Sequence, residues 1–198
     1  MGFGLKKQQS AAVRPDGTPL CIDCGLCCNG VLYGHVDVPN DEVDELVALG
    51  FAIHRDTERP TFQQPCPMLR GTLCSVYADR PSTCRKYRCA LLTRYQNEEL
   101  SLEESISIVA KAKELVREVN EGLPANATLR TLRNERSANF AGIESVAEND
   151  RAQFTRRHLR LAMLERFLDR YFRKESDKVF VDTMAADEPP YDGPLPTS

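Results

Sequence analysis

Cysteine placement is the feature that most constrains this chain. All eight cysteines of the 198 residues lie in the first half, and four of them fall within the run CIDCGLCCNG, residues 21–30. Two residues between successive cysteines let the side chains converge while the intervening amides point at the sulfurs, which suits metal chelation. We therefore predict that thiols bind metal here, with eight candidate ligands: Cys21, Cys24, Cys27, Cys28, Cys66, Cys74, Cys84 and Cys89.

A disulfide framework is the main alternative for an even number of cysteines. Disulfides, however, belong to oxidising compartments and to small secreted domains. The N-terminal residues contain no apolar core of a secretory signal, and no apolar run is long enough to span a bilayer. We therefore expect a cytoplasmic protein with no membrane partner, whose thiols stay reduced. A hydrophobic content of 41% also provides a core without disulfides.

The spacing admits two kinds of cofactor and two ways of sharing the ligands. Zinc takes four thiolates tetrahedrally, whereas bacterial ferredoxins use the same first three spacings for an iron–sulfur cluster. A single four-ligand site would leave the remaining cysteines as small apolar residues of the core. Two sites are equally compatible, because adjacent side chains in extended backbone point to opposite sides. One site would then take Cys21, Cys24, Cys27 and Cys66, and the other Cys28, Cys74, Cys84 and Cys89.

Residues 65–89 surround the later cysteines with prolines and cations. Cys84 and Cys89 are five residues apart, about 140° around a helix, so both can face one site only if the helix ends between them. Four thiolates on a divalent metal carry about two negative charges, which nearby cations would offset. The candidates are Arg70, Arg80, Arg85, Lys86 and Arg88, of which Lys86 and Arg88 are explained equally well as surface residues.

The pattern of all these motifs resembles a known family. Cys-x2-Cys-x2-Cys-Cys is followed by Pro-Cys-Pro-x-Leu (65–69), Cys-x-x-Tyr (74–77), Arg-Pro-x-x-Cys-Arg (80–85) and Cys89. This order is similar to that of the YkgJ-type cysteine-cluster family, a zinc- or iron-chelating domain, over about seventy residues. The resemblance implies metal binding by these cysteines. A related motif in flagellin lysine methylases implies, more distantly, a protein-modifying enzyme.

Hydrophobic periodicity predicts short elements in the first half and longer helices in the second. We expect a strand at 31–38, a helix over 40–50, and a hairpin with arms at 51–55 and 61–64. Ser101 and Glu104 form a capping box that starts a helix reaching about residue 119. A shorter helix follows at 128–140, and a short strand or arm is expected at 178–181. A helix opening at Asp150 places on one face Phe154, Leu161, Leu164, Leu168 and Phe172.

These elements predict an α+β fold with little sheet. We expect a flexible leader at 1–20, a small cysteine-rich metal-binding domain at 21–95, a helical extension packed on it at 100–182, and a disordered tail at 183–198. The Arg-rich segment 156–174 does not indicate nucleic-acid binding, because its aromatic residues fall on the face that forms the core.

Two functions are compatible with this thiol set. The first is a metal-binding protein that chelates zinc or an iron–sulfur cluster through the eight cysteines. The second is an iron–sulfur-dependent redox enzyme or a cluster-dependent protein-modifying enzyme. No cysteine pairs with a histidine as an activated nucleophile would require, so no catalytic residue is identified. With eight thiols available, His35 and His54 are expected to be surface residues of strands rather than ligands.

Overall fold

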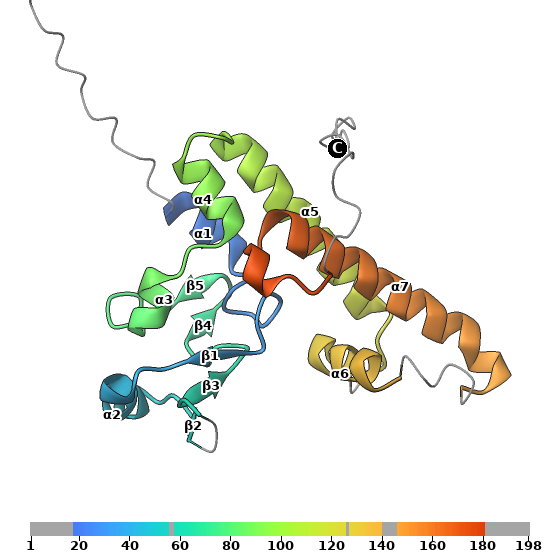
Figure 1. Cartoon of the computed structure of the whole chain (residues 1–198), viewed down its shortest axis with the longest axis horizontal. Helices are drawn as coiled ribbons and strands as arrows, with labels where there is room; N and C mark the ends of the chain where they lie inside the picture. Colours follow the sequence, from blue (N-terminus) through green and yellow to red (C-terminus); the bar gives the residue numbers. More distant parts are fainter. Residues whose placement is uncertain (1–17, 56–57, 126, 140–145, 181–198) are drawn as a thin grey trace, which may run out of the picture.

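The computed structural model describes residues 18–55, 58–125, 127–139 and 146–180. Most of the predicted leader and all of the predicted tail at 183–198 lie outside these residues. The described part is rich in helix and contains one three-stranded and one two-stranded sheet, which confirms the expected α+β fold with little sheet. Figure 1 shows the three-stranded sheet and α2 at one end of the molecule, away from the long helices.

The three-stranded sheet contains β1 (His35–Asp37), β2 (Ile53–His54) and β3 (Thr61–Gln63), in the order β1-β3-β2. Both pairs are antiparallel, so the expected hairpin is confirmed, with Ile53 opposite Phe62. The strand predicted at 31–38 is shorter than expected. The helix predicted over 40–50 consists of a 3-10 turn, η1 (Asn40–Glu42), and α2 (Val43–Ala48). A small core joins these elements: Val38, Val43, Leu46, Phe51 and Phe62.

Short elements carry the remaining part of the cysteine segment. Helix α1 (Thr18–Cys24) precedes the sheet, and a hairpin of β4 (Leu69–Arg70) and β5 (Leu73–Cys74) follows it. Helix α3 (Ser82–Lys86) and helix α4 (Ala90–Gln96) come next. The helix that contains Cys84 therefore ends before Cys89, so the two thiols are not constrained to one helical surface.

The second half is helical as predicted: α5 (Leu102–Glu121), α6 (Leu129–Asn139), α7 (Glu148–Tyr171) and the 3-10 turn η3 (Glu175–Asp177). The capping box is present, since the Ser101 side chain accepts from the Glu104 amide and the Glu104 carboxylate accepts from the Ser101 amide. Residues 178–180 are not a strand; instead, the amides of Val179 and Phe180 donate to the Asp169 carboxylate.

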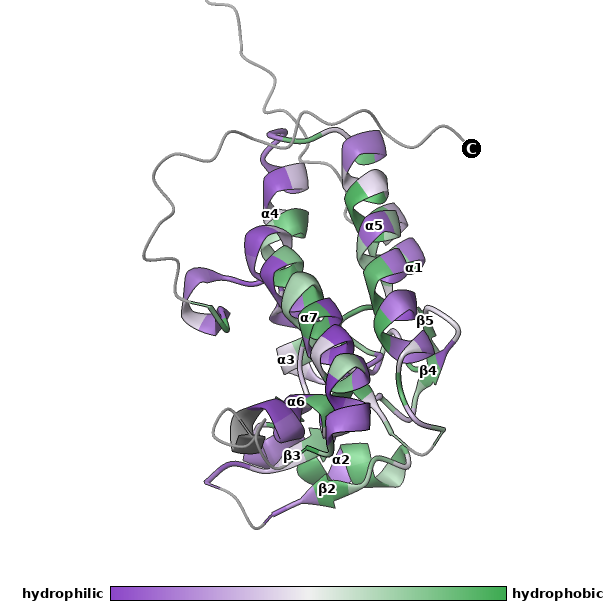
Figure 2. Cartoon of the chain, turned by 90° about the vertical axis from the view of Figure 1, so that its right-hand side faces the viewer, coloured by the Kyte–Doolittle hydropathy of each residue, from purple (hydrophilic) through white to green (hydrophobic). Residues whose placement is uncertain are grey.

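A large core joins the cysteine segment to the helices. Leu26 and Leu91, from the cysteine segment, lie in one cluster with Val109 of α5 and Leu164 of α7, all at most 1% exposed. Figure 2 shows hydrophobic and hydrophilic residues on different sides of α5 and α7, as expected for helices with one buried face. Each such buried leucine stabilises the fold by about 1.5–3 kcal/mol.

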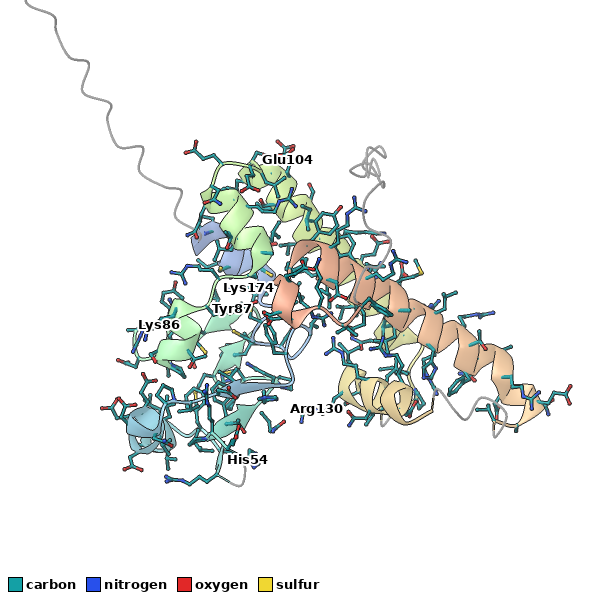
Figure 3. All side chains as sticks on the ribbon, viewed as in Figure 1. His54, Lys86, Tyr87, Glu104, Arg130 and Lys174 are labelled. Atoms are coloured by element: carbon teal, nitrogen blue, oxygen red, sulfur yellow. The ribbon has the colours of Figure 1, made fainter. Side chains whose placement is uncertain are left out.

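Two arginines of α6 also bind the backbone of the cysteine segment. Arg130 donates to the carbonyl oxygens of Gly34 (2.5 Å) and Gln64 (2.8 Å), and Figure 3 shows it between α6 and the strands. Arg133 donates to the carbonyl oxygens of Gly30 (3.1 Å) and Val31 (2.6 Å). None of the helices in the described ranges is long and apolar enough to cross a membrane.

Candidate metal centre

The run 21–30 forms a helix end followed by a tight turn. Cys21 and Cys24 lie on α1, and Cys27 and Cys28 lie in the turn behind it. Gly25 enables this turn with a φ of +68°, and its amide donates to the Cys21 carbonyl oxygen at 3.4 Å. A Cβ at Gly25 would lie 3.2–3.3 Å from atoms of Thr72, so glycine also lets the β4–β5 turn approach. Local conformation thus brings four thiols to one place.

The other four cysteines arrive on separate elements. Cys66 precedes β4, and its amide donates to the Cys28 carbonyl oxygen at 2.7 Å. Cys74 lies in β5 opposite Leu69, Cys84 lies in α3, and Cys89 is the N-cap residue of α4. All eight are free thiols, of which Cys21 is exposed and the other seven are partly buried.

Four thiols lie near one another at the large core, three packed on it and Cys21 exposed beside them; we call Cys21, Cys24, Cys27 and Cys89 the first cysteine group. Cys24, Cys27 and Cys89 all pack on that core. Burial, together with the nearby thiols of Cys89 and Cys21, raises the pKa of Cys24 to about 12. Burial also raises the pKa of Cys27 well above its usual value, with Cys89 and Cys24 as the nearest contributing thiols. Burial and the neighbouring Cys21 raise the pKa of Cys89 to about 11.

The second cysteine group, Cys28, Cys66, Cys74 and Cys84, gathers near the small core. Cys66 and Cys84 pack on that core. Burial, followed by the thiols of Cys66 and Cys74, raises the pKa of Cys28 to about 11. Burial and the same neighbours, joined by Cys28, raise the pKa of Cys84 to about 12. Burial raises the pKa of Cys66 as well, with Cys74 contributing.

This grouping differs from the two-site sharing considered from the sequence, which placed Cys66 with Cys21, Cys24 and Cys27, and Cys89 with Cys28, Cys74 and Cys84. Which thiols bind one metal stays a prediction. Cys66 lies beside Cys28 because of the hydrogen bond between their backbones. Cys89 lies with Cys24 and Cys27 because it begins α4, whose Leu91 and Leu92 enter the large core. The two groups are neighbours, and they meet at Cys27 and Cys28.

Backbone amides point at several of the sulfurs. The Leu92 amide donates to Cys89 Sγ at 3.3 Å, and such hydrogen bonds oppose the rise in the pKa of that thiol. Amides of Leu26 and of Met68 act in the same direction on the pKa of Cys24 and of Cys66. These bonds favour the thiolate, the form that binds metal. The donor set, four thiols in each group with amides directed at the sulfur, therefore fits zinc or an iron–sulfur cluster chemically.

Neither group is closed around a metal position. Among the described residues, no group of three or more His, Cys, Asp or Glu side chains is arranged so that it could hold a metal ion. The structure thus brings the thiols into two neighbourhoods without setting their coordination geometry.

The structure distinguishes among the predicted cations. Arg80 lies near the second cysteine group and lowers the pKa of both Cys28 and Cys84, against the larger effect of burial. Arg70 acts in the same way on Cys66. Arg85 instead pairs with Glu42 at 3.9 Å, and Arg88 donates to the carbonyl oxygens of Arg85 and Tyr87. Charge compensation at the thiols therefore involves Arg80 and Arg70.

Several residues near the first cysteine group were not predicted from the sequence. Lys113 of α5 donates to the Asp23 carbonyl oxygen and lowers the pKa of Cys24 against burial. Tyr33 and Tyr87 lie near Cys27, and Asp177 of η3 binds Tyr33 at 2.9 Å. Lys113 and Asp177 lie 90 and 144 residues from their partners, and no local pattern in the sequence indicates either contact.

The histidines lie on the surface or in other contacts. His35 is 3.8 Å from Asp37 on β1, and His54 is exposed on β2, as expected. His158 makes a hydrogen bond of 2.9 Å with the Phe154 carbonyl oxygen and packs on the Phe154 ring.

Comparison with known proteins supports this reading of the thiols. Residues 20–107 match the family model CxxCxxCC, described as a putative zinc- or iron-chelating domain. No curated protein and no solved structure matches the chain. The matched segment contains all eight cysteines and ends inside α5, so it includes the first turns of the helical half. The resemblance seen in the sequence is confirmed: residues 20–107 match the CxxCxxCC family, which supports metal binding by this part of the chain.

Proposed function

We propose that this protein binds metal at two neighbouring sites, each made of four thiolates. The first site takes Cys21, Cys24, Cys27 and Cys89, and the second takes Cys28, Cys66, Cys74 and Cys84. The observation that carries the proposal is that Cys24, Cys27 and Cys89 pack on the large core whereas Cys66 and Cys84 pack on the small one. The thiols that act on the pKa values of Cys89 and Cys84 add Cys21 to the first set, and Cys28 and Cys74 to the second.

The number of thiols in each group supports this proposal over a single site. Zinc is held by four cysteines in structural sites, and a four-iron cluster also takes four. Different thiols act most strongly on the pKa values of adjacent Cys27 and Cys28: after burial, Cys89 and Cys24 for Cys27, and Cys66 and Cys74 for Cys28. Two four-ligand sites use every thiol, whereas one site would leave four ionisable thiols partly buried beside a charged centre.

Metal binding would also order the fold around the thiols. The second cysteine group lies among short elements, namely two-residue strands and the five-residue α3, which provide few hydrogen bonds of their own. Because the unfolded chain does not hold the four thiols together, metal binds mainly to the folded form, and its binding free energy adds to the folding free energy. We therefore assign the sites a structural or chelating role within the domain.

Metal stoichiometry in paired cysteine variants tests the proposal. The wild-type protein, purified without oxygen, should contain two equivalents of zinc or two clusters. Cys24→Ser with Cys89→Ser should lose one equivalent, because both residues belong to the first site. Cys24→Ser with Cys66→Ser should lose both equivalents, because the pair disables both sites.

These two double variants distinguish the proposed ligand sets from those considered from the sequence. The latter predict that the first variant loses both equivalents and the second loses one. A wild-type protein with one equivalent or fewer would contradict the two-site proposal. Metal identity follows from the same samples. An absorbance band near ~400 nm with iron and sulfide indicates clusters, and a colourless protein with stoichiometric zinc indicates zinc sites.

A further inference from the structure

The C-terminal segment behind α7 crosses the first cysteine group. The Ala90 amide, next to Cys89, donates to the Phe172 carbonyl oxygen at 3.0 Å. At the far end, the Val179 and Phe180 amides donate to the Asp169 carboxylate at 2.9–3.1 Å. Both ends of the segment 172–180 are therefore attached, one beside the cysteine and one on α7.

Asp177, between these ends, is hydrogen-bonded to two tyrosines in series. The Tyr33 hydroxyl donates to Asp177 Oδ2 at 2.9 Å and lies 2.8 Å from the Tyr87 hydroxyl. Because Tyr33 uses its only proton toward the carboxylate, Tyr87 must donate to Tyr33. The two rings meet edge to face at 5.5 Å, and Lys174 Nζ lies 5.7 Å from the centre of the Tyr87 ring. Figure 3 shows Tyr87 and Lys174 beside each other where α7 ends.

The two tyrosines lie near the first cysteine group. Tyr33 packs on the same core as Cys24, Cys27 and Cys89. The Cys27 thiol is close enough to act on the pKa of both tyrosines, and the Cys89 thiol acts on that of Tyr87, although burial has the larger effect on each. The segment 172–180 therefore reaches the thiols through these two rings.

Beside the second cysteine group, the turn of the β4–β5 hairpin is open to solvent in the described part of the chain. Arg70, Gly71, Thr72 and Leu73 at that turn are exposed, and Leu73 is 52% exposed. Tyr77, three residues after Cys74, is also 52% exposed. Solvent thus reaches the chain beside the second group more readily than it reaches the Tyr33–Tyr87 side of the first.

We infer that Asp177 is a positioning residue that, through Tyr33 and Tyr87, holds the segment 172–180 closed over the first cysteine group, so that metal leaves this site much more slowly than the second. The inference rests on the proposed two-site function. Its physical basis is access: Cys21 is exposed, but a chelator must also reach the partly buried sulfurs of Cys24, Cys27 and Cys89 before the metal leaves this site. A hydrogen-bonded chain of two rings and a carboxylate restricts that access.

Metal transfer to a chromophoric chelator tests the inference. The wild-type protein should release metal in two phases, one equivalent fast and one slow. Asp177→Ala and Tyr87→Phe should accelerate the slow phase by about tenfold or more, as expected for loss of a supporting hydrogen bond near a metal site, and leave the fast phase unchanged. Asp177→Asn keeps an acceptor oxygen for Tyr33 and should restore the slow phase. Glu175→Ala, on the same 3-10 turn but 88% exposed at its side chain, is the matched control and should resemble wild type.

Alkylation of individual cysteines, followed by mass spectrometry, shows which cysteine group loses its metal in each phase. Cys21, Cys24, Cys27 and Cys89 should be modified with the slow phase and the other four with the fast phase. Equal acceleration of both phases in the variants, or slow modification of the second group instead, would overturn the inference. A wild-type protein with fewer than two equivalents contradicts the proposed function. In that case the alkylation rates still test whether Asp177 protects the first cysteine group. If these cysteines react as slowly in Asp177→Ala as in the wild type, the inference is refuted.

Discussion

Cys27 and Cys28 are the residues at which the two cysteine groups meet. The Cys27 side chain packs on the large core, while the Cys28 carbonyl oxygen accepts a hydrogen bond from Cys66. Although the two residues lie in a tight turn rather than an extended strand, different thiols act most strongly on them, so a doubled cysteine can contribute to two sites.

Arg80 is the cation we expect to matter most at the second cysteine group. It stacks over the Tyr77 ring at 3.7 Å, and its buried Nε has no hydrogen-bond partner within the described part of the chain. Arg80→Met keeps the apolar stem but removes the charge that favours the Cys28 and Cys84 thiolates. We expect the metal affinity of the second site to fall about tenfold.

Chelator competition in the Cys24→Ser, Cys89→Ser background, which retains only the second site, measures this effect. Arg88→Met is the matched control, because Arg88 binds only backbone carbonyl oxygens in the described contacts. An equal loss of affinity in both variants would show that general surface charge, rather than Arg80, favours the thiolates.

Helix α6 supports the cysteine segment although it lies outside the matched family domain. Arg133 connects the Gly30 and Val31 carbonyl oxygens to Glu165 of α7 at 2.7 Å. Glu165 is 1% exposed and also pairs with Arg173 at 2.7 Å, and Arg173 pairs with Asp169 at 2.8 Å. A buried network of alternating charge therefore links the turn after Cys28 to the segment 172–180.

Breaking this network should cost substantial stability. Arg173→Met leaves Glu165 and Asp169 buried with one cation fewer, and removing one partner of a buried pair typically costs about 3–5 kcal/mol of unfolding free energy. Lys111→Met, which removes a surface pair with Glu114 at 2.9 Å, should change the unfolding free energy far less, because solvent screens an exposed ion pair. Urea unfolding of metal-loaded protein measures both. A similar small change in the two variants would mean that the network contributes little.

At the scale of the whole molecule, the cysteine segment and the helices are not separate structural units. Leu20, Leu26, Val31 and Leu32 lie in the same cluster as residues of α5, α6 and α7. Within the described ranges, the three-stranded sheet and α2 share a separate, smaller core. The first cysteine group therefore depends on the helical half for its surroundings, whereas the second depends on the smaller core.

The pKa values of the thiols predict how the stability of the metal-free protein varies with pH. Burial raises the pKa of Cys24 and Cys84 to about 12, compared with 9.0 for an ordinary thiol. The fold thus favours the neutral thiol, and this stabilisation is complete below about pH 9 and is lost as pH rises toward about 12. We expect the unfolding free energy of the metal-free protein to fall by at least about 1 kcal/mol between about pH 8 and about pH 10.

The metal-bound protein should not show this loss, because its thiols are already deprotonated. Urea unfolding of the two forms at both pH values provides the measurement. Parallel falls in the two forms would indicate that groups other than the thiols cause the pH dependence.

Local patterns in the sequence were sufficient to predict metal binding and to place most of the helices and strands. The cysteine spacings indicated a chelating domain, which the family match supports, and the Ser101–Glu104 capping box marked the start of α5. The hairpin of β2 and β3 and the buried face of α7 followed from periodicity. These features succeed because each depends on residues a few positions apart, where backbone geometry alone determines which side chains meet.

Only the tertiary structure decided which thiols lie together and what surrounds them. Cys66 lies beside Cys28 and Cys89 lies near Cys24, and neither proximity follows from the spacing of the cysteines. The group in which each cysteine lies depends on which of the two cores its neighbouring residues pack into. Those cores contain residues far apart along the chain. Asp177, Lys113 and Arg133 reach the cysteine segment for the same reason: helix packing, rather than any local motif, brings them there.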